Sequence, residues 1–170
     1  IRPTWGNETF CLNKAYRFLD KSSFNVKTLK FYLTSFKLLN NDKVVFNEKG
    51  SYHLIDLSDT NSLKFEIEKG NKKDFSKISF QLGVDSLANQ SGAIGGDLDS
   101  TKGMYWSWQS GYVNFKMEGN KMASKNERKG VEFEYHLGGY RSPFNSIQKV
   151  SLDVKRSNTI LIKFDVAQFI

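Results

Sequence analysis

Alternation of apolar and polar residues is the dominant pattern along this chain. It is clearest in residues 63–68, where every odd residue is apolar and every even residue is charged. The same period of two recurs in five further runs, at residues 78–84, 112–117, 131–135, 150–154 and 160–166. A period of two places successive side chains on opposite faces of a β-strand. The pattern therefore predicts a protein built from short β-strands.

Clusters of Asn, Asp, Glu and Gly separate these runs, for example at residues 40–42, 95–97 and 118–120. Such clusters are typical of turns between antiparallel strands. One segment, residues 82–90, has spacing that fits one or two helical turns. We therefore predict an all-β fold, an antiparallel β-sandwich with immunoglobulin-like or related Greek-key topology. No internal repeat or linker interrupts the pattern, so residues 1–170 are interpreted as a single domain.

Composition narrows the classes of function. The chain has 170 residues, enough for one sizeable core, and carries a formal charge of +7. Its 25 basic residues are mostly Lys, scattered opposite the apolar positions, whereas nucleic-acid recognition favours clustered Arg. We therefore expect no nucleic-acid partner. The single cysteine excludes an internal disulfide, and we expect a monomer.

Only two histidines are present, so any site based on imidazole must use one or both of them. His136 falls on the polar side of the run 132–136, whereas His53 shares the parity of the apolar Ile55. A lone histidine is often a hydrogen-bonded structural residue, and that interpretation stays open for each. No nucleophile motif and no paired zinc-ligand spacing accompany them. We therefore predict that the protein is not an enzyme.

An acidic turn at residues 95–103 offers hard oxygen ligands. Asp97 and Asp99, together with Asp85 from an earlier loop, predict a possible calcium site. The turn lacks the later glutamate of an EF-hand loop. The alternative is that these carboxylates cap the amides of their own turns.

The segment 104–112 contains two tryptophans, Trp106 and Trp108, two positions apart. In a strand they would point to one face together with Met104. Paired tryptophans on a strand usually belong to a core. Exposed pairs are also typical of carbohydrate-binding surfaces, which gives an alternative function.

Four segments together resemble the MbnP family. Gly96-Asp97-Leu98-Asp99 followed by Gly103-Met104-Tyr105-Trp106-Ser107-Trp108-Gln109-Ser110-Gly111-Tyr112 is similar to the family's signature. Residues 31–39, residues 80–85 with Asn89, and Tyr135-His136-Leu137-Gly138 resemble its early strand, central strand and late histidine motif. The similarity extends from about residue 28 to residue 139.

This resemblance implies an exported copper-binding protein, periplasmic or anchored to the outer membrane by a lipid outside this sequence. In the family, two imidazoles and a kynurenine made from tryptophan hold copper, and a di-haem peroxidase-like partner makes the kynurenine. Carried over, the imidazoles are His136 and, as the remaining histidine, His53. The modified residue is Trp106 or Trp108. A shared copper then requires the two imidazoles to lie within about 4 Å of each other.

The sequence departs from the family pattern in one place. Many relatives follow the late histidine with Gly-Ser-Thr and a cysteine, whereas this chain has Gly138-Gly139-Tyr140. The family's usual disulfide is therefore missing. Two alternatives to copper binding remain: a carbohydrate- or ligand-binding module that uses Trp106 and Trp108, and a structural envelope domain that has lost the metal.

Overall fold

The computed structural model describes all residues except 18–21, 68–73, 109–110, 123–129, 156 and 170. Its strands are β1 Arg2–Trp5, β2 Glu8–Thr9, β3 Ala15–Arg17, β4 Ser23–Asn40, β5 Lys43–Asn47, β6 Tyr52–Asp56, β7 Lys77–Leu82, β8 Tyr105–Trp106, β9 Gly111–Met122, β10 Val131–Gly138, β11 Tyr140–Arg141, β12 Phe144–Asn145, β13 Gln148–Asp153 and β14 Lys163–Asp165. Helical segments are α1 Ser86–Ser91 and the 3₁₀ turns η1 Thr60–Leu63, η2 Gly96–Leu98, η3 Ser100–Lys102 and η4 Val166–Phe169.

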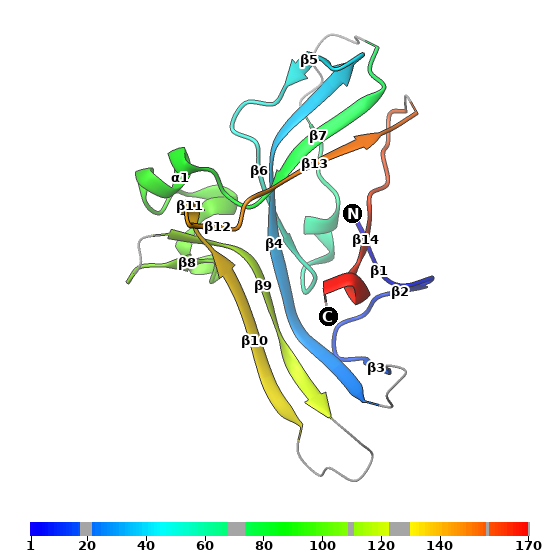
Figure 1. The fold of residues 1–170 in the computed structure, drawn as a ribbon, viewed down its shortest axis with the longest axis vertical. Coiled ribbons are helices and arrows are strands. Elements are labelled where there is room, and N and C mark those ends of the chain that lie inside the picture. The colour runs from blue at the N-terminus through cyan, green and yellow to red at the C-terminus, as the bar shows by residue number, and fades with distance from the viewer. Residues whose placement is uncertain (18–21, 68–73, 109–110, 123–129, 156, 170) are drawn as a thin grey trace.

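The long strand β4 is the centre of a nine-stranded sheet (Figure 1). Lys30 in its middle pairs with Lys116 of β9 and with Asp56 of β6, so these two strands lie on opposite sides of β4. β10 lies beyond β9, and β13 lies beyond β7. A smaller sheet has the order β14-β1-β2, and β11 and β12 form a separate hairpin.

β4 changes the face to which its apolar residues point. Its register shifts between Val26 and Thr28, and again between Thr34 and Lys37. At the second shift Ser35 adopts a left-handed conformation, with φ +56°. An extra residue in one strand reverses the parity of the side chains that follow. Consequently the β4 residues in the core cluster of one face are even up to Val26, odd from Leu29 to Leu33, and even again at Phe36.

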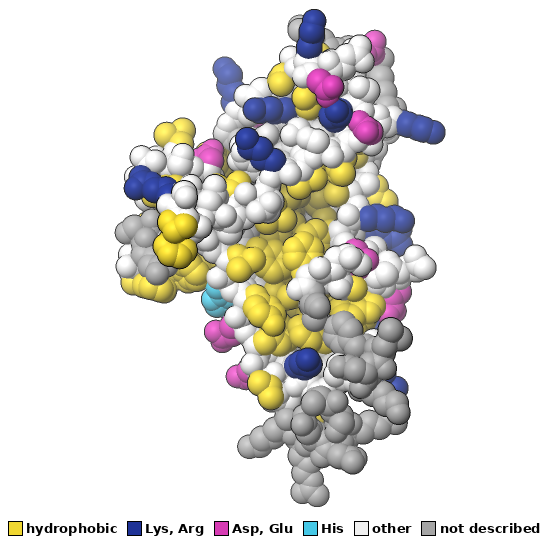
Figure 2. Space-filling view, viewed as in Figure 1, with side chains coloured by type: hydrophobic (Ala, Val, Ile, Leu, Met, Phe, Trp, Pro, Cys, Tyr) yellow, Lys and Arg dark blue, Asp and Glu magenta, His cyan; other side chains and the backbone are white. Residues whose placement is uncertain are grey.

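The two faces of the sheet carry separate apolar clusters. On what we call the Phe31 face, Phe31 stacks on Phe164 of β14, with ring centroids 4.5 Å apart. The N- and C-terminal segments cover this face, and Figure 2 shows apolar side chains gathered over the middle of the molecule. On the opposite Tyr32 face, Tyr32 and Leu54 pack with Val84, Leu98 and Met104 from the segment that contains α1, η2 and β8.

The prediction of an all-β sandwich is confirmed. Most strand pairs are antiparallel, although β1 and β14 pair in parallel. The short helix α1 overlaps the segment 82–90 that the sequence predicts to be helical and ends one residue beyond it. Among the described residues, no helix is long and apolar enough to cross a membrane.

One predicted strand is absent. Residues 64–67 of the run 63–68 are described, and they pair with no strand. Leu63, Phe65 and Ile67 nevertheless pack against the core cluster of the Phe31 face, while Lys64 and Glu66 are exposed. The alternation therefore reflects an extended segment with one buried side, which the period of two cannot distinguish from a hydrogen-bonded strand.

Candidate functional site

His53 lies on β6 and faces the core of the Phe31 face. Its Nε2 lies 3.0 Å from Glu48 Oε2, and its ring stacks on Phe65 at 3.9 Å between centroids. Ser51 Oγ donates to the same carboxylate oxygen and accepts from the Phe36 N–H. The Glu48 side chain is only 6% exposed, so His53 and Ser51 are the groups that compensate a buried carboxylate. This is a structural arrangement.

His136 lies on β10 and faces the opposite way, on the Tyr32 face. Its Nε2 lies 2.8 Å from Glu118 Oε1 on β9, and Lys116 contacts the same oxygen at 3.2 Å. Burial raises the pKa of Glu118, but hydrogen bonds from His136, Thr28 and Lys116 outweigh it and hold the pKa below its ordinary value. Glu118 is therefore an anion that orients the imidazole.

The structure does not bring the two histidines together. His53 is opposite Leu33 on β4, whereas His136 is opposite Lys116, which is opposite Lys30. Residues 30 and 33 precede the second register shift and have opposite parity, so the imidazoles lie on opposite faces of the sheet. Three strand spacings also separate them, about 14 Å. The prediction of one copper held by both His53 and His136 is therefore wrong for this fold.

Trp106 lies beside His136. The centroids of the two rings are 6.2 Å apart, and the Trp108 ring lies 5.6 Å from Trp106 on its other side. Trp106 is half-buried, whereas Trp108 is 74% exposed. β8 ends at Trp106, so Trp108 lies in a turn, and the prediction that both belong to one strand with Met104 is wrong. Met104 alone is fully buried.

An open cavity of about 420 Å³ joins these residues, and we call it the Trp106 cavity. Its lining is Trp106, Gly111, Tyr112, His136, Gly138, Gly139, Tyr140 and Phe144. Phe144, on β12, is 80% exposed. The cavity is thus an aromatic pocket with one imidazole in its wall.

Asn114 fixes the wall formed by the hairpin β11–β12. This asparagine is fully buried on β9. Its Nδ2 donates to the Gly139 carbonyl and to Ser146 Oγ, and its Oδ1 accepts from the Val84 N–H. One side chain therefore joins β9, the hairpin and the loop before α1.

The three aspartates of the predicted calcium site are separately engaged. Asp85 caps α1 through the Ala88 N–H and accepts from the Tyr52 hydroxyl. Asp99 caps η3 through Thr101, and Asp97 accepts from the Leu54 N–H and pairs with Lys102. No group of three or more metal-binding side chains occurs in the part of the chain that the structure describes. The calcium site expected from Asp85, Asp97 and Asp99 is therefore not formed, and turn capping accounts for them.

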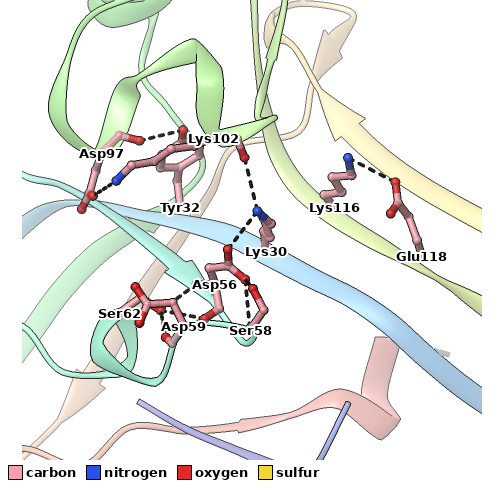
Figure 3. A network of polar contacts seen from close by, with 10 residues as sticks. All are labelled: Lys30, Tyr32, Asp56, Ser58, Asp59, Ser62, Asp97, Lys102, Lys116 and Glu118. Atoms are coloured by element: carbon pink, nitrogen blue, oxygen red, sulfur yellow. Dashed lines mark hydrogen bonds and ion pairs between the residues drawn. The ribbon is translucent and has the colours of Figure 1, made fainter. Parts of the chain in front are cut away.

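A row of charges crosses the Tyr32 face from β6 through β4 to β9 (Figure 3). Lys30 pairs with Asp56 at 2.8 Å and donates to the Lys102 carbonyl, while Lys116 pairs with Glu118. Burial raises the pKa of Asp56, yet hydrogen bonds from Lys30 and Ser58 bring it below its ordinary value. Because these ions are paired with one another, the row stabilises the fold, and His136 lies beside it through its contact with Glu118.

As they stand, the side chains of the Trp106 cavity fit copper only in part. His136 supplies one imidazole. Because its Nε2–H donates to Glu118, the lone pair that could bind a metal is on Nδ1. Indole is a donor only and cannot ligate without oxidation.

Sequence reasoning missed Glu118 and Phe144. The pairing of Glu118 with His136 depends on the register of β9 and β10, which the alternating pattern does not encode.

The fold places the chain among all-β sandwich proteins with an aromatic cavity at one end of the sheet. A profile of the MbnP family matches residues 1–170, so the chain belongs to the MbnP family. It is similar in structure to MbnP from Methylosinus trichosporium, with a TM-score of 0.53 and 13% identity, covering 89% of this chain and 68% of that one. None of the curated proteins compared matches the chain.

Proposed function

We propose that this protein binds copper as an exported carrier and does not act as a catalyst, with His136 and an oxidised Trp106 as ligands. The observation that carries the proposal is the position of the Trp106 ring beside the His136 ring, 6.2 Å between centroids, in an open cavity. Membership of the MbnP family supports the choice of copper. His53 has no part in this site, because it faces the other side of the sheet.

The chemistry follows from the donor groups. The Glu118 carboxylate fixes the orientation of the His136 ring, as carboxylates do behind metal-binding histidines. Cleavage of the C2–C3 bond of the Trp106 indole by a peroxidase partner, with two oxygen atoms added and the N-formyl group then hydrolysed to formate, would leave an aryl amine beside that imidazole. Two nitrogen donors then suit a low-coordinate copper ion. Trp106 is favoured over Trp108 because it is half-buried and adjacent to the imidazole.

A partner must supply the oxidation. Opening an indole requires an oxidant, and the resemblance to the family indicates a di-haem peroxidase-like protein as its source. Trp108 and Phe144 are exposed beside the cavity, so that partner could approach Trp106 from solvent. The same resemblance supports a periplasmic or outer-membrane-anchored location, with a lipid anchor outside this sequence.

The proposal is tested by Cu(I) titration of protein made with and without the peroxidase partner. Co-expressed protein should bind more tightly, and mass spectrometry should locate the modification at Trp106. His136→Gln should abolish tight binding, whereas His53→Gln, the matched control, should lower stability and leave the affinity unchanged. Tight binding by His136→Gln, or binding that is lost in His53→Gln, would contradict this assignment.

Carbohydrate binding is a second candidate, favoured by the exposure of Trp108 and Phe144. Flat aromatic rings at the surface give sugars an apolar contact. Trp108 is 74% exposed and Phe144 is 80% exposed, and both lie next to the cavity wall. A glycan array followed by titration of Trp108→Ala tests this reading. Sugar binding that depends on Trp108, without copper binding in the co-expressed protein, would favour it. Absence of both activities would leave a structural envelope domain.

A further inference from the structure

The outer edge of β10 presents a strand of eight residues to solvent. β10 pairs with β9 along one side, and within the described ranges no strand pairs with its other side. On the Phe31 face it exposes Val131, Tyr135 and Leu137, which are 70%, 48% and 50% exposed. A long edge with exposed apolar residues is a template for a further strand.

The Tyr32 side of the same edge carries charge. Glu132 and Glu134 are exposed, and His136 follows them on the same face. Figure 2 shows acidic side chains and a histidine along this edge. The acidic edge belongs to a chain with a net charge of +7, so it differs from the rest of the surface. A strand that pairs here must therefore place cationic or neutral groups opposite the glutamates.

The sequence of β10 meets that requirement itself in one antiparallel register. Residues that lie opposite each other in a β10–β10 pair must point to the same face of the sheet. The two-fold axis therefore passes beside one residue, which lies opposite the same residue of the second copy. An axis at Phe133 sets Glu132 against Glu134 of the second copy, and an axis at Glu134 sets that residue against itself. Like charges directly opposite each other are destabilising.

An axis at Tyr135 removes the conflict. It sets Glu134 opposite His136 of the second copy on one face, and Phe133 opposite Leu137 of the second copy on the other. Apolar pairs stabilise neighbouring strands, and this register places no glutamate opposite another. An axis at His136 also avoids acidic pairs, but it shortens the overlap from residues 132–138 to residues 134–138.

We propose that β10 pairs with β10 of a second copy of this chain, antiparallel, with the two-fold axis at Tyr135. This replaces the expectation of a monomer. The pairing continues the nine-stranded sheet across two chains and covers both exposed rows of the edge. It is carried by the free edge, by its exposed apolar row and by a register in which no glutamate lies opposite another.

The register brings the two His136 side chains together. Each lies opposite Glu134 of the other copy, so the two histidines are diagonal neighbours on one face. Such neighbours are about 7–8 Å apart at the backbone, within reach of long side chains. Two imidazoles at this separation can share one metal ion. The second imidazole that His53 cannot supply thus comes from the second copy, a step that rests on the proposed copper function.

Cross-linking tests the register. In a Cys11→Ser background, Tyr135→Cys places two thiols opposite each other, and mild oxidation should give a covalent dimer. Glu132→Cys is the matched control. Residue 132 of each copy lies opposite Gly138 of the other copy, so the two thiols are about 20 Å apart. Cross-linking of Glu132→Cys but not of Tyr135→Cys would overturn the register.

Sedimentation velocity tests the pairing without any cross-link. The unmodified chain should dimerise with rising concentration, and Tyr135→Lys should stay monomeric. Leu87→Lys is the control: Leu87 is 72% exposed on α1, away from the edge, and the variant should dimerise like the parent. A parent chain that stays monomeric, or a Tyr135→Lys chain that still dimerises, would overturn the proposal.

Copper separates this proposal from the proposed function. Cu(I) should shift the parent towards dimer at least several-fold and leave His136→Gln unshifted. Dimers that bind copper without such a shift would overturn the shared imidazole site while the pairing stands. Dimers that cross-link at Tyr135 but bind no copper in any form would overturn the copper function alone.

Discussion

The indole of Trp106 packs over the backbone of Gly138. A Cβ atom at position 138 would lie 2.8 Å from Cζ3 of that indole, closer than such atoms approach in real structures. The glycine is therefore required by the ring and not by backbone conformation, since its φ is not left-handed. This contact holds Trp106 at the distance from His136 on which the proposed copper site depends.

Gly138→Ala should therefore displace the Trp106 ring from its position beside His136. We expect a loss of about 1–3 kcal/mol in stability, as for overpacking elsewhere, with a change in tryptophan fluorescence and near-UV circular dichroism. Copper affinity of the co-expressed protein should fall as well. Gly95→Ala is the control, because a Cβ there meets nothing within 4 Å. Unchanged spectra in Gly138→Ala would contradict the contact.

Asn114→Ala should destabilise the protein by about 2–4 kcal/mol, because it removes three hydrogen bonds and leaves the Val84 N–H buried without a partner. The loss should be largest at the β11–β12 hairpin, since two of the bonds hold it. Urea denaturation gives the free energy of unfolding, and hydrogen exchange locates the effect. Equal protection of the hairpin in variant and parent would show that Asn114 does not anchor it.

Acid should destabilise the protein partly through Asp56. Its folded pKa lies below the ordinary value of 3.8, so the unfolded chain binds the proton more tightly. The stability this carboxylate contributes is complete above that value and is lost as the pH falls through the folded pKa. Asp56→Asn should therefore be less stable than the parent near neutral pH, and the difference should narrow below about pH 4. Asp153→Asn is the control, since Asp153 is 90% exposed. A constant difference across the pH range would refute the linkage.

Calcium should leave the melting temperature unchanged. Asp97 is paired with Lys102, while Asp85 and Asp99 cap their own helical turns, so none offers a free carboxylate to a shared ion. Differential scanning calorimetry with calcium and with chelator tests this. The Tyr52 hydroxyl donates a hydrogen bond to Asp85. Burial and this carboxylate raise the pKa of Tyr52 to about 12, so the hydroxyl keeps its proton and its bond to Asp85. A calcium-dependent rise in melting temperature would mean that these aspartates rearrange around the ion.

Local pattern was enough to predict the strand content and the side to which each histidine points. The alternation of residues 131–135 predicted that His136 lies on a polar face. The shared parity of His53 and Ile55 predicted that His53 lies near a core. Both predictions are correct. Alternation within one strand does not show, however, which of its residues share a face of the sheet with residues of another strand. Whether two histidines share a face depends on strand order and register across β4, and the shift at Ser35 alters that register locally.

The aromatic site shows the same limit. The spacing of Trp106 and Trp108 was sufficient to predict that the rings are neighbours, and they are. It was not sufficient to predict that β8 ends between them, because that depends on the turn which follows Trp106. Phe144 could not be connected to this site either. It enters the cavity wall through the hairpin that Asn114 holds, and no pattern within residues 140–145 marks that contact.

The central position of β4 has a consequence for how the protein reaches its folded state. This strand is synthesised early, yet one of its edges is completed only by β7 and β9, so that Leu33 must wait for Leu82 and Phe31 for Phe115. Contacts between residues so distant in sequence slow folding, because the entropy of closing a long loop is lost before the stabilising contacts form. Until then one edge of this eighteen-residue strand stays unpaired, although β5 and β6 can already pair with the other edge. For the exported location proposed above, a chaperone that shields residues 23–40 after membrane crossing would therefore aid folding.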